Sequence, residues 1–254
     1  MPKKPFLISI EGNIGAGKST ILEHLEKHLT SSLPANKVLF LKEPLDIWEN
    51  FHDEAGNNIL QKFYANQVRY AFTFQVMAFI TRLSLLRQAI HNNPDVDIII
   101  IERSLCADKN IFMNMLHADG IVEKIEFDIY NKWYAEYIEK YRVDAVIYMD
   151  SNPEVCSVRI NRRNRNGEDN IPLDYLKKCR DFHTKWLVDT VCSETQCVAE
   201  FVTLHTINHE GFNYPVLKID SNQDTDYNKQ DPNSVGNKWL DAISRFVRGT
   251  QVPL

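Results

Sequence analysis

The sequence predicts an α/β fold in which a five-stranded parallel sheet is flanked by helices. Short apolar runs are spaced along the chain, and segments with helical periodicity lie between them. Strands that alternate with helices are joined by right-handed crossovers, which make neighbouring strands parallel. A run of four isoleucines at residues 98–101 also suits a strand that helices cover on both faces.

The predicted elements follow in order along the chain. We expect strands at residues 6–10, 38–41, 96–101, 145–149 and 216–219. We expect helices at residues 18–29, 57–91 (with a break near Ala65-Asn66), 105–117, 123–140, 153–165, 172–192 and 232–247, with Pro172 in a first turn. The polar stretches 193–214 and 221–231 are predicted to be long surface connections. Since no repeat or clear boundary interrupts this pattern, residues 1–254 are expected to form a single domain.

The composition excludes several classes of protein. Hydrophobic residues make up 44% of the 254 residues and charged residues 25%, which is the balance of a globular domain rather than of a disordered or fibrous chain. The net charge of −5 argues against a nucleic-acid partner, so any anion site must be a local basic patch. No apolar run approaches the roughly 20 residues of a membrane span, so no membrane partner is expected.

The cysteines and the first residues bear on the compartment. The five cysteines are an odd number, and the close pair Cys192 and Cys197 has the spacing of neither a disulfide framework nor a zinc knuckle. We therefore expect reduced thiols. Because the chain enters its first apolar run at Phe6, we expect no targeting segment and a cytoplasmic location, with an organellar origin left open.

The first predicted strand runs directly into a phosphate-binding loop. The segment Gly12-Asn13-Ile14-Gly15-Ala16-Gly17-Lys18-Ser19-Thr20 matches G-x-x-x-x-G-K-[ST]. Glycines let backbone N–H groups turn toward phosphate oxygens, and the helix that begins near Lys18 adds its positive end. Lys18 is expected to reach the β- and γ-phosphates, and the Ser19 hydroxyl is expected to bind Mg²⁺. The motif predicts nucleoside triphosphate binding.

Charged residues follow the next two predicted strands. Glu43 comes after residues 38–41, and Glu102-Arg103 comes after residues 96–101. Ligands of open parallel sheets bind outside the carboxyl ends of the strands, so these side chains should lie beside the phosphate loop. Phosphoryl transfer needs a base for the acceptor hydroxyl, an acid that orders the metal and cations around the transferred group. Lys18, Glu43, Glu102 and Arg103 are therefore the catalytic candidates.

Four arginines lie within seven residues, at positions 159, 162, 163 and 165. On a helix, the first three share one side. We interpret residues 159–170 as an arginine-rich lid that closes over phosphates and excludes water. A solvated helix face or a nucleic-acid patch is the alternative interpretation.

Two short matches to GTPase motifs are weaker evidence than the phosphate-loop motif. Residues 53–56 match D-x-x-G and residues 228–231 match N-K-x-D. Neither match follows a predicted strand, and both lie in polar sequence, so a GTPase is not favoured.

Taken together, the motifs resemble the deoxynucleoside kinase family, and most closely its deoxycytidine, deoxyguanosine and deoxyadenosine kinase branch. They occur in one order between residues 5 and about 190: the phosphate loop, Glu43-Pro44 with Trp48, Phe74-Gln75, Glu102-Arg103-Ser104 with Asp108, and residues 159–168 followed by Ile171-Pro172-Leu173. The resemblance implies a P-loop kinase fold and the phosphorylation of a deoxynucleoside 5′-hydroxyl. The implied phosphate donor is ATP, used with Mg²⁺, and UTP or another nucleoside triphosphate is the alternative donor. The resemblance also implies a homodimer formed through helices between residues 105 and 140.

The resemblance assigns roles to single residues as well. Glu43 would be the general base, Glu102 would order Mg²⁺ and is the alternative base, and Arg103 would hold the 5′-oxygen and the transferred phosphoryl group. For the nucleoside, the resemblance implies that Tyr64 and Glu168 bind the sugar 3′-hydroxyl and that Gln75 binds the base edge. The implied walls of the base pocket are Trp48, Phe63, Phe74 and Phe112. For the donor, it implies Lys18, Arg159, Arg163 and Arg165 at the phosphates and Asp224 in the adenine-binding loop.

A base preference follows from three residues at i, i+3 and i+7 on one helix face, namely Gln75, Ala78 and Arg82. In the resemblance, Arg82 pairs with Asp108 behind the base. A carboxylate accepts from the amino group of cytosine or adenine and repels the carbonyl of thymine, while Arg82 could meet the guanine oxygen. We therefore expect deoxycytidine or purine deoxynucleosides to be preferred over thymidine.

The sequence departs from the family pattern at three places. Phe63 stands where the deoxycytidine branch tends to carry methionine, and Thr225 stands where an aromatic residue would stack on adenine. Residues 193–212 form an insertion without an assignable counterpart. Two alternatives stay open, a nucleoside monophosphate kinase and an inactive nucleotide-binding regulator.

Overall fold

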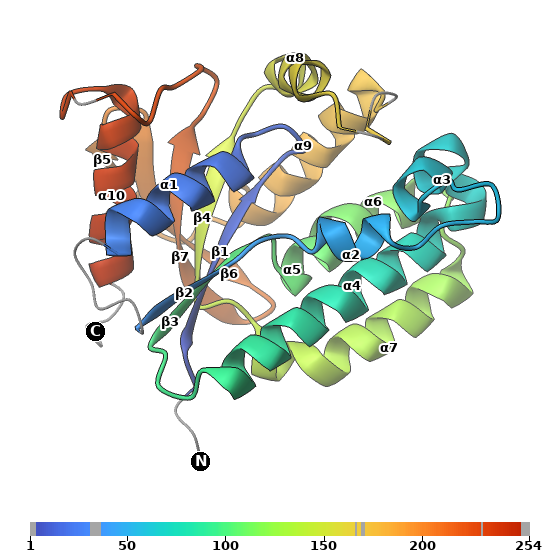
Figure 1. Cartoon of the computed structure of the whole chain (residues 1–254). Coiled ribbons are helices and arrows are strands. Elements are labelled where there is room, and N and C mark those ends of the chain that lie inside the picture. The colour runs from blue at the N-terminus through green and yellow to red at the C-terminus, as the bar shows by residue number, and fades with distance from the viewer. Residues whose placement is uncertain (1–3, 31–36, 166, 169–170, 230, 250–254) are drawn as a thin grey trace.

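The computed structural model describes residues 4–30, 37–165, 167–168, 171–229 and 231–249. Its centre is a seven-stranded sheet in the order β2-β3-β1-β4-β7-β6-β5 (Figure 1). The strands are β1 (Phe6–Gly12), β2 (Val38–Leu41), β3 (Ile98–Glu102), β4 (Ala145–Asp150), β5 (Gln196–Ala199), β6 (Val202–His209) and β7 (Phe212–Asp220). The five strands β2, β3, β1, β4 and β7 are mutually parallel, as predicted, and correspond to the five predicted runs.

The prediction of five strands in the sheet was wrong, because two antiparallel strands extend it. β6 pairs with β7, and β5 pairs with β6, within a region predicted to be a surface connection. Glu210 and Gly211 form a two-residue turn with φ of 52° and 79°, and His209 faces Phe212 across it. Turns with two positive φ values match the twist of a hairpin, so this pair fixes β6 against β7.

Helices cover both faces of the sheet (Figure 1). They are α1 (Lys18–Thr30), α2 (Leu45–Glu49), α3 (Ile59–Ala65), α4 (Gln67–Asn92), α5 (Leu105–Ala107), α6 (Asn114–Ala118), α7 (Lys124–Tyr141), α8 (Pro153–Arg163), α9 (Leu173–Leu187) and α10 (Val235–Gly249), with a π-helix η1 (Asp108–Met113) between α5 and α6. One buried cluster joins α1 and α10 to Ile8 and Ile10 of β1. A second joins α4, α7 and η1 to Leu7, since alternate residues of a strand face opposite sides.

One predicted helix boundary is confirmed and several others differ. The predicted break near Asn66 is confirmed, and the Asn66 side chain caps α4 by accepting from the Arg69 amide at 3.1 Å. The α8 helix ends at Arg163 because Asn164 is left-handed, with φ of 48°. The α9 helix ends at Leu187 rather than at 192, because the chain beyond it pairs with β6: the Cys192 amide donates to the Thr206 carbonyl at 2.9 Å. The short helix α2 was not predicted.

Strand register brings three strand ends to one edge of the sheet. Ile10 of β1 lies beside Glu102 of β3, Leu41 of β2 lies beside Ile101, and Gly12 lies beside Met149 of β4. The residues that follow β1, β2 and β3 therefore share one edge, as expected for a parallel sheet.

Two further observations concern the cysteines and the helices. All five cysteines are free thiols; three are buried, and Cys192 and Cys197 are exposed. Among the described residues, no helix combines the length and apolar character needed to cross a membrane.

Candidate active site

A cavity of about 530 Å³ lies where β1, β2 and β3 end. Its described lining carries more cationic than anionic side chains, although the chain as a whole is acidic. The cations are Lys18, Arg82, Arg103, Arg159, Arg162, Arg163 and Arg165, and the carboxylates are Glu43, Glu102, Asp108, Glu168 and Asp224. A local positive excess of this kind suits an anionic, phosphate-bearing ligand.

The phosphate loop follows β1 and is tied to the rest of the fold. Gly15 has φ of 80°, and a Cβ there would come within 2.6 Å of the Cys156 carbonyl oxygen of α8, so only glycine fits. The Asn13 side chain donates to the Leu176 carbonyl of α9 at 2.8 Å. The Lys18 ammonium donates to the carbonyls of Gly12 at 3.2 Å and Asn13 at 2.9 Å. These contacts hold the loop in shape.

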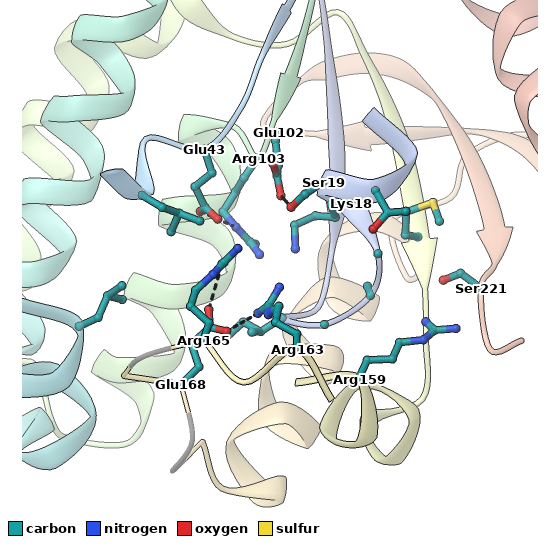
Figure 2. A pocket seen from close by; sticks show the side chains of 18 of the residues that line it. Lys18, Ser19, Glu43, Glu102, Arg103, Arg159, Arg163, Arg165, Glu168 and Ser221 are labelled. Carbon is teal, nitrogen blue, oxygen red and sulfur yellow. Dashed lines mark hydrogen bonds and ion pairs between the residues drawn. The ribbon is translucent and has the colours of Figure 1, made fainter. Parts of the chain in front are cut away.

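Ser19 and Glu102 place two hard oxygen ligands together beside the loop. The Ser19 hydroxyl donates to Glu102 Oε1 at 2.6 Å (Figure 2). Hydroxyl and carboxylate oxygens suit Mg²⁺, which binds few protein groups and completes its shell with water and phosphate. Among the described residues, no cluster of three His, Cys, Asp or Glu side chains could hold a metal by itself. The site thus fits a metal that arrives with a nucleotide.

Glu43 lies between two arginines. Its Oε1 is 3.1 Å from Arg82 Nη2 and 3.3 Å from Arg103 Nε. Burial acts to raise the pKa of Glu43, but the charges of Arg82, Arg103 and Lys18 outweigh it and lower the pKa to about 2. Glu43 is therefore a carboxylate at every physiological pH. Figure 2 shows Glu43, Arg103 and Lys18 converging on the cavity from three segments.

Arg103 combines a fixed position with a free donor. Its Nη2 donates to the Gly12 carbonyl at 3.2 Å, and its guanidinium lies 4.7 Å from the centre of the Phe112 ring. Its Nη1 is buried and has no hydrogen-bond partner among the described residues. A buried, unpaired donor is costly, so a ligand oxygen is the natural partner for it.

A second ion pair lies deeper in the cavity. Arg82 Nε is 3.0 Å from Asp108 Oδ2, and its Nη2 is 3.2 Å from Asp108 Oδ1, which makes a bidentate pair. Gln75, Ala78 and Arg82 are all buried on one face of α4, as predicted. Asp108 opens the π-helix η1, and π-helical turns are frequent at functional sites.

Aromatic rings enclose this end of the cavity. Phe63 stacks on Phe74 with a centroid distance of 4.8 Å, and Trp48 meets Phe74 edge-on at 5.5 Å. The Trp48 indole donates to the Thr81 hydroxyl at 2.8 Å, which fixes its orientation. With Phe112, these rings form an apolar slot that leads to the Arg82–Asp108 pair.

The arginines after β4 are each paired with a carboxylate. Arg163 and Arg165 both bind Glu168, the latter at 3.3 Å (Figure 2). Arg159 and Arg162 both form ion pairs with Asp224 of the loop after β7, with N–O distances of 3.0 and 2.7 Å. Residues 166, 169 and 170 of the predicted lid lie outside the described residues.

Residues 8–244 match the model of the family "Deoxynucleoside kinase". The chain belongs to this family. It is 36% identical over 244 residues to a protein of fowlpox virus (strain NVSL) named a probable deoxycytidine kinase, which covers 94% of this chain and 88% of the relative. Human deoxycytidine kinase is 30% identical over 240 residues, with coverage of 85% and 84%. The mitochondrial deoxyguanosine kinase of Xenopus laevis is 27% identical over 259 residues, with coverage of 95% and 89%.

The protein is thus a deoxynucleoside kinase, an enzyme that transfers a phosphoryl group from a nucleotide to a deoxynucleoside. Nearly all of the site residues predicted from the sequence line the one cavity, from Ile14 in the phosphate loop to Asp224 after β7. The exceptions are Gly12 and Asn13, whose backbone carbonyls accept hydrogen bonds from Lys18. The individual roles of all these site residues stay predictions.

Three aromatic lining residues of this deoxynucleoside kinase were missed by sequence reasoning, namely Tyr175, Tyr227 and Trp239. Tyr175 of α9 meets the rings of Phe63 and Tyr64 edge-on, at 6.5 and 6.1 Å. Tyr227 stacks on His24 at 4.9 Å, two residues beyond the Thr225 that interrupts the family pattern. An aromatic residue displaced by two positions in the same loop was the signal available for Tyr227.

Lys18 gives this kinase a predictable pH dependence. Burial, aided by the charge of Arg103, lowers the pKa of Lys18 to about 8, so the free enzyme loses this cation as the pH rises through that value. We expect kcat/KM for the nucleotide to fall above about pH 8, while kcat persists to higher pH because bound phosphates favour the charged form. Initial rates measured from about pH 6 to about pH 10 check this, and a flat kcat/KM over that range would contradict it.

Proposed function

We propose that this enzyme phosphorylates the 5′-hydroxyl of deoxycytidine or purine deoxynucleosides, with ATP as donor. The observation that carries the proposal is the Glu43–Arg103 pair, which lies between the aromatic slot and the phosphate loop. A nucleoside with its base in the slot would direct its 5′-carbon toward this pair. The curated relatives named deoxycytidine and deoxyguanosine kinases support the same acceptors.

The acceptor is bound by groups of three kinds. Trp48, Phe63, Phe74 and Phe112 would enclose the base, and Gln75 would hydrogen-bond its edge. Tyr64 and Glu168 would bind the 3′-hydroxyl. Burial raises the pKa of Tyr64, and the nearby Glu168 carboxylate adds to this, so the phenol stays protonated and can donate a hydrogen bond. The opposing characters of Tyr64 and Glu168 suit a hydroxyl, which both donates and accepts.

The reaction moves one phosphoryl group and one proton. Glu43 accepts the proton of the 5′-hydroxyl while the 5′-oxygen bonds to the γ-phosphorus and the bond to ADP breaks. Arg103 and Lys18 neutralise the charge that develops on the transferred group. Ser19 and, through water, Glu102 would hold Mg²⁺, which would supply further positive charge at the phosphates. The lid arginines Arg163 and Arg165, which pair with Glu168, line the same cavity and would add further positive charge.

The donor base would lie near the loop after β7. Arg159 and Asp224 border the cavity there, and Tyr227 offers aromatic surface where Thr225 cannot. ATP is the proposed donor, and UTP or another nucleoside triphosphate is the alternative. Initial rates with ATP and UTP at equal concentration decide between them.

The experiment that tests the proposal is a phosphorylation assay with ATP and Mg²⁺. Deoxycytidine, deoxyadenosine, deoxyguanosine and thymidine are compared, with dCMP as the control. Turnover of an amino-bearing or guanine deoxynucleoside is expected. Turnover of dCMP alone would favour a nucleoside monophosphate kinase, and nucleotide binding without any turnover would favour an inactive regulator.

A homodimer formed through α7 and α4 is part of the proposal. Ile125, Ile129 and Trp133 are exposed at four-residue spacing on α7, and Ile80 is exposed on the adjacent α4 (Figure 1). An exposed apolar stripe of this kind suits an interface between copies.

We expect light scattering to give the mass of a dimer. Replacing Ile129 and Trp133 together by glutamate should produce a monomer, because the charges would have to be buried in the interface. The matched control is Val198→Glu on β5, an exposed valine at the far edge of the sheet. A monomeric parent protein, or a dimer that survives both glutamates, would contradict the interface.

The expected cytoplasmic location is also a proposal. Among the relatives, the Xenopus laevis deoxyguanosine kinase is named mitochondrial, so the family does not decide the compartment. Microscopy of the full chain fused to a fluorescent protein tests it.

A further inference from the structure

Arg103 has a backbone conformation that residues with a side chain rarely adopt. Its φ is 65°, in the left-handed region. The same residue carries the guanidinium that contacts Glu43 and the Gly12 carbonyl. Such a conformation persists only where surrounding contacts hold it, and it occurs preferentially at active sites. The turn that presents Arg103 must therefore be held from elsewhere in the fold.

Glu11 supplies the holding contacts from the neighbouring strand. It lies in β1 directly before Gly12, and its side chain is fully buried. Its Oε1 accepts hydrogen bonds from the Ser104 amide at 3.0 Å and from the Ser104 hydroxyl at 2.6 Å. The Ser104 hydroxyl oxygen accepts in turn from the Ala107 amide at 3.2 Å, which caps α5. One carboxylate oxygen thus fixes the residue after Arg103 and the helix that follows.

The rest of the Glu11 carboxylate points to a role beyond packing. Its Oε2 is buried without a hydrogen-bond partner among the described residues. Burial raises the pKa of Glu11, while the charge of Arg103 and the hydrogen bonds from Ser104 oppose the rise. A buried carboxylate with one oxygen unpaired is a poor means of stabilising a fold. The two hydrogen bonds from Ser104 to Glu11 are better explained by a role in fixing the position of Arg103, which directly precedes Ser104.

We propose that Glu11 is a positioning residue for phosphoryl transfer, which anchors Ser104 and thereby holds Arg103 in its left-handed conformation with the guanidinium at the cavity. The inference rests on the proposed function of Arg103 in the kinase reaction. A misplacement of about 1 Å in a catalytic group can lower a rate by about 10²-fold, so loss of this anchor should act mainly on kcat. The base slot is built from α2, α3, α4 and η1, so nucleoside binding should change little.

The test compares two replacements of Glu11 on the full chain. Glu11→Ala removes the acceptor for both Ser104 donors, and we expect kcat to fall about 10²-fold, with the dissociation constants of deoxycytidine and ATP changed less than about threefold. Glu11→Gln keeps an acceptor oxygen at the same place, so its kcat should stay within about fivefold of the parent value. The matched control is Ser244→Ala on α10, which removes another buried hydroxyl, one that donates within its own helix to the Leu240 carbonyl at 2.7 Å.

A double replacement tests whether Glu11 acts through Ser104. We expect Glu11→Ala combined with Ser104→Ala to be no more than about twofold slower than Glu11→Ala alone, because the two side chains share one interaction. Multiplicative losses would overturn the proposal. So would a parent-like kcat in Glu11→Ala, an equal loss in Glu11→Gln and Glu11→Ala, or a loss of binding affinity that parallels the loss of kcat.

Circular dichroism separates misfolding from misplacement. If Glu11→Ala does not fold, Ser104→Ala alone decides: a roughly tenfold lower kcat with unchanged dissociation constants supports the anchor, and a parent-like kcat overturns it. A parent enzyme that phosphorylates none of the deoxynucleosides would overturn the proposed function, and this inference with it. An active parent enzyme whose Glu11 and Ser104 variants behave otherwise than expected would overturn this inference alone.

Discussion

Replacing Glu43 with glutamine is expected to lower kcat by about 10²-fold or more, with a much smaller effect on the dissociation constant of the deoxynucleoside. Glutamine keeps the shape of the side chain and an acceptor oxygen for Arg82 and Arg103. It cannot take the proton of the 5′-hydroxyl, and it removes the negative charge that orients that hydroxyl. The loss should therefore appear in the chemical step.

The low pKa of Glu43 is compatible with this role. The carboxyl has a pKa of about 2 without ligands, so it is a weak base but is ionised at every working pH. Phosphoryl transfer passes through a loose transition state, in which the bond to the leaving group is largely broken, so a permanently charged acceptor that orients the hydroxyl is sufficient. Ionisation of Glu43 should consequently produce no acidic limb in the pH profile between about pH 5 and about pH 8.

Single-turnover rates with ATP and deoxycytidine, together with calorimetric titration of the nucleoside, measure the two effects separately. The control is Glu49→Gln, an exposed glutamate on α2 six residues away. A parent-like rate in Glu43→Gln would transfer the base role to Glu102.

Asp108→Asn is expected to weaken the discrimination against thymidine. In the parent enzyme, kcat/KM for deoxycytidine should exceed that for thymidine by about 10²-fold or more, because the Asp108 carboxylate repels the thymine carbonyl and accepts from the cytosine amino group. An asparagine side chain can accept from Arg82 through its oxygen and donate to the thymine carbonyl through its nitrogen. The ratio of the two kcat/KM values should fall at least about tenfold.

Competition between the two nucleosides for one enzyme sample measures this ratio directly. Asp119→Asn is the control, since Asp119 lies beyond α6 and binds Lys178 at 2.8 Å rather than a residue of the base slot. A parent enzyme that prefers thymidine, or a ratio that Asp108→Asn leaves unchanged, would mean that the Arg82–Asp108 pair does not read the base.

The parallel part of the fold and the site could be predicted because both depend on local patterns. Five buried runs specify the parallel strands, and the side chains at the ends of β1, β2 and β3 must share one edge of the sheet. Lys18, Glu43 and Arg103 are predictable in this way, because each lies shortly after the end of one of these three strands.

The features that were not predicted have two causes. One is a sequence signal that was overlooked: Glu210-Gly211 lies between strand-forming residues and is a hairpin signal for β6 and β7, from which the extension of the sheet by β6 and β5 follows. The other is a contact between distant segments. The salt bridge between Arg82 and Glu43 is such a contact, because 39 residues separate the two side chains along the chain. The packing of α4 against β2 and β3 brings them together. The π-helical turn at Asp108 has no sequence pattern of its own.

A crystal structure with a deoxynucleoside and an unreactive ATP analogue bound tests the role of Glu43 most directly. We expect the 5′-oxygen to lie within about 3.2 Å of a Glu43 carboxylate oxygen, in line with the γ-phosphorus, with the base between Phe74 and Phe112. A 5′-oxygen bound to Glu102 instead, or a base outside the aromatic slot, would contradict this expectation.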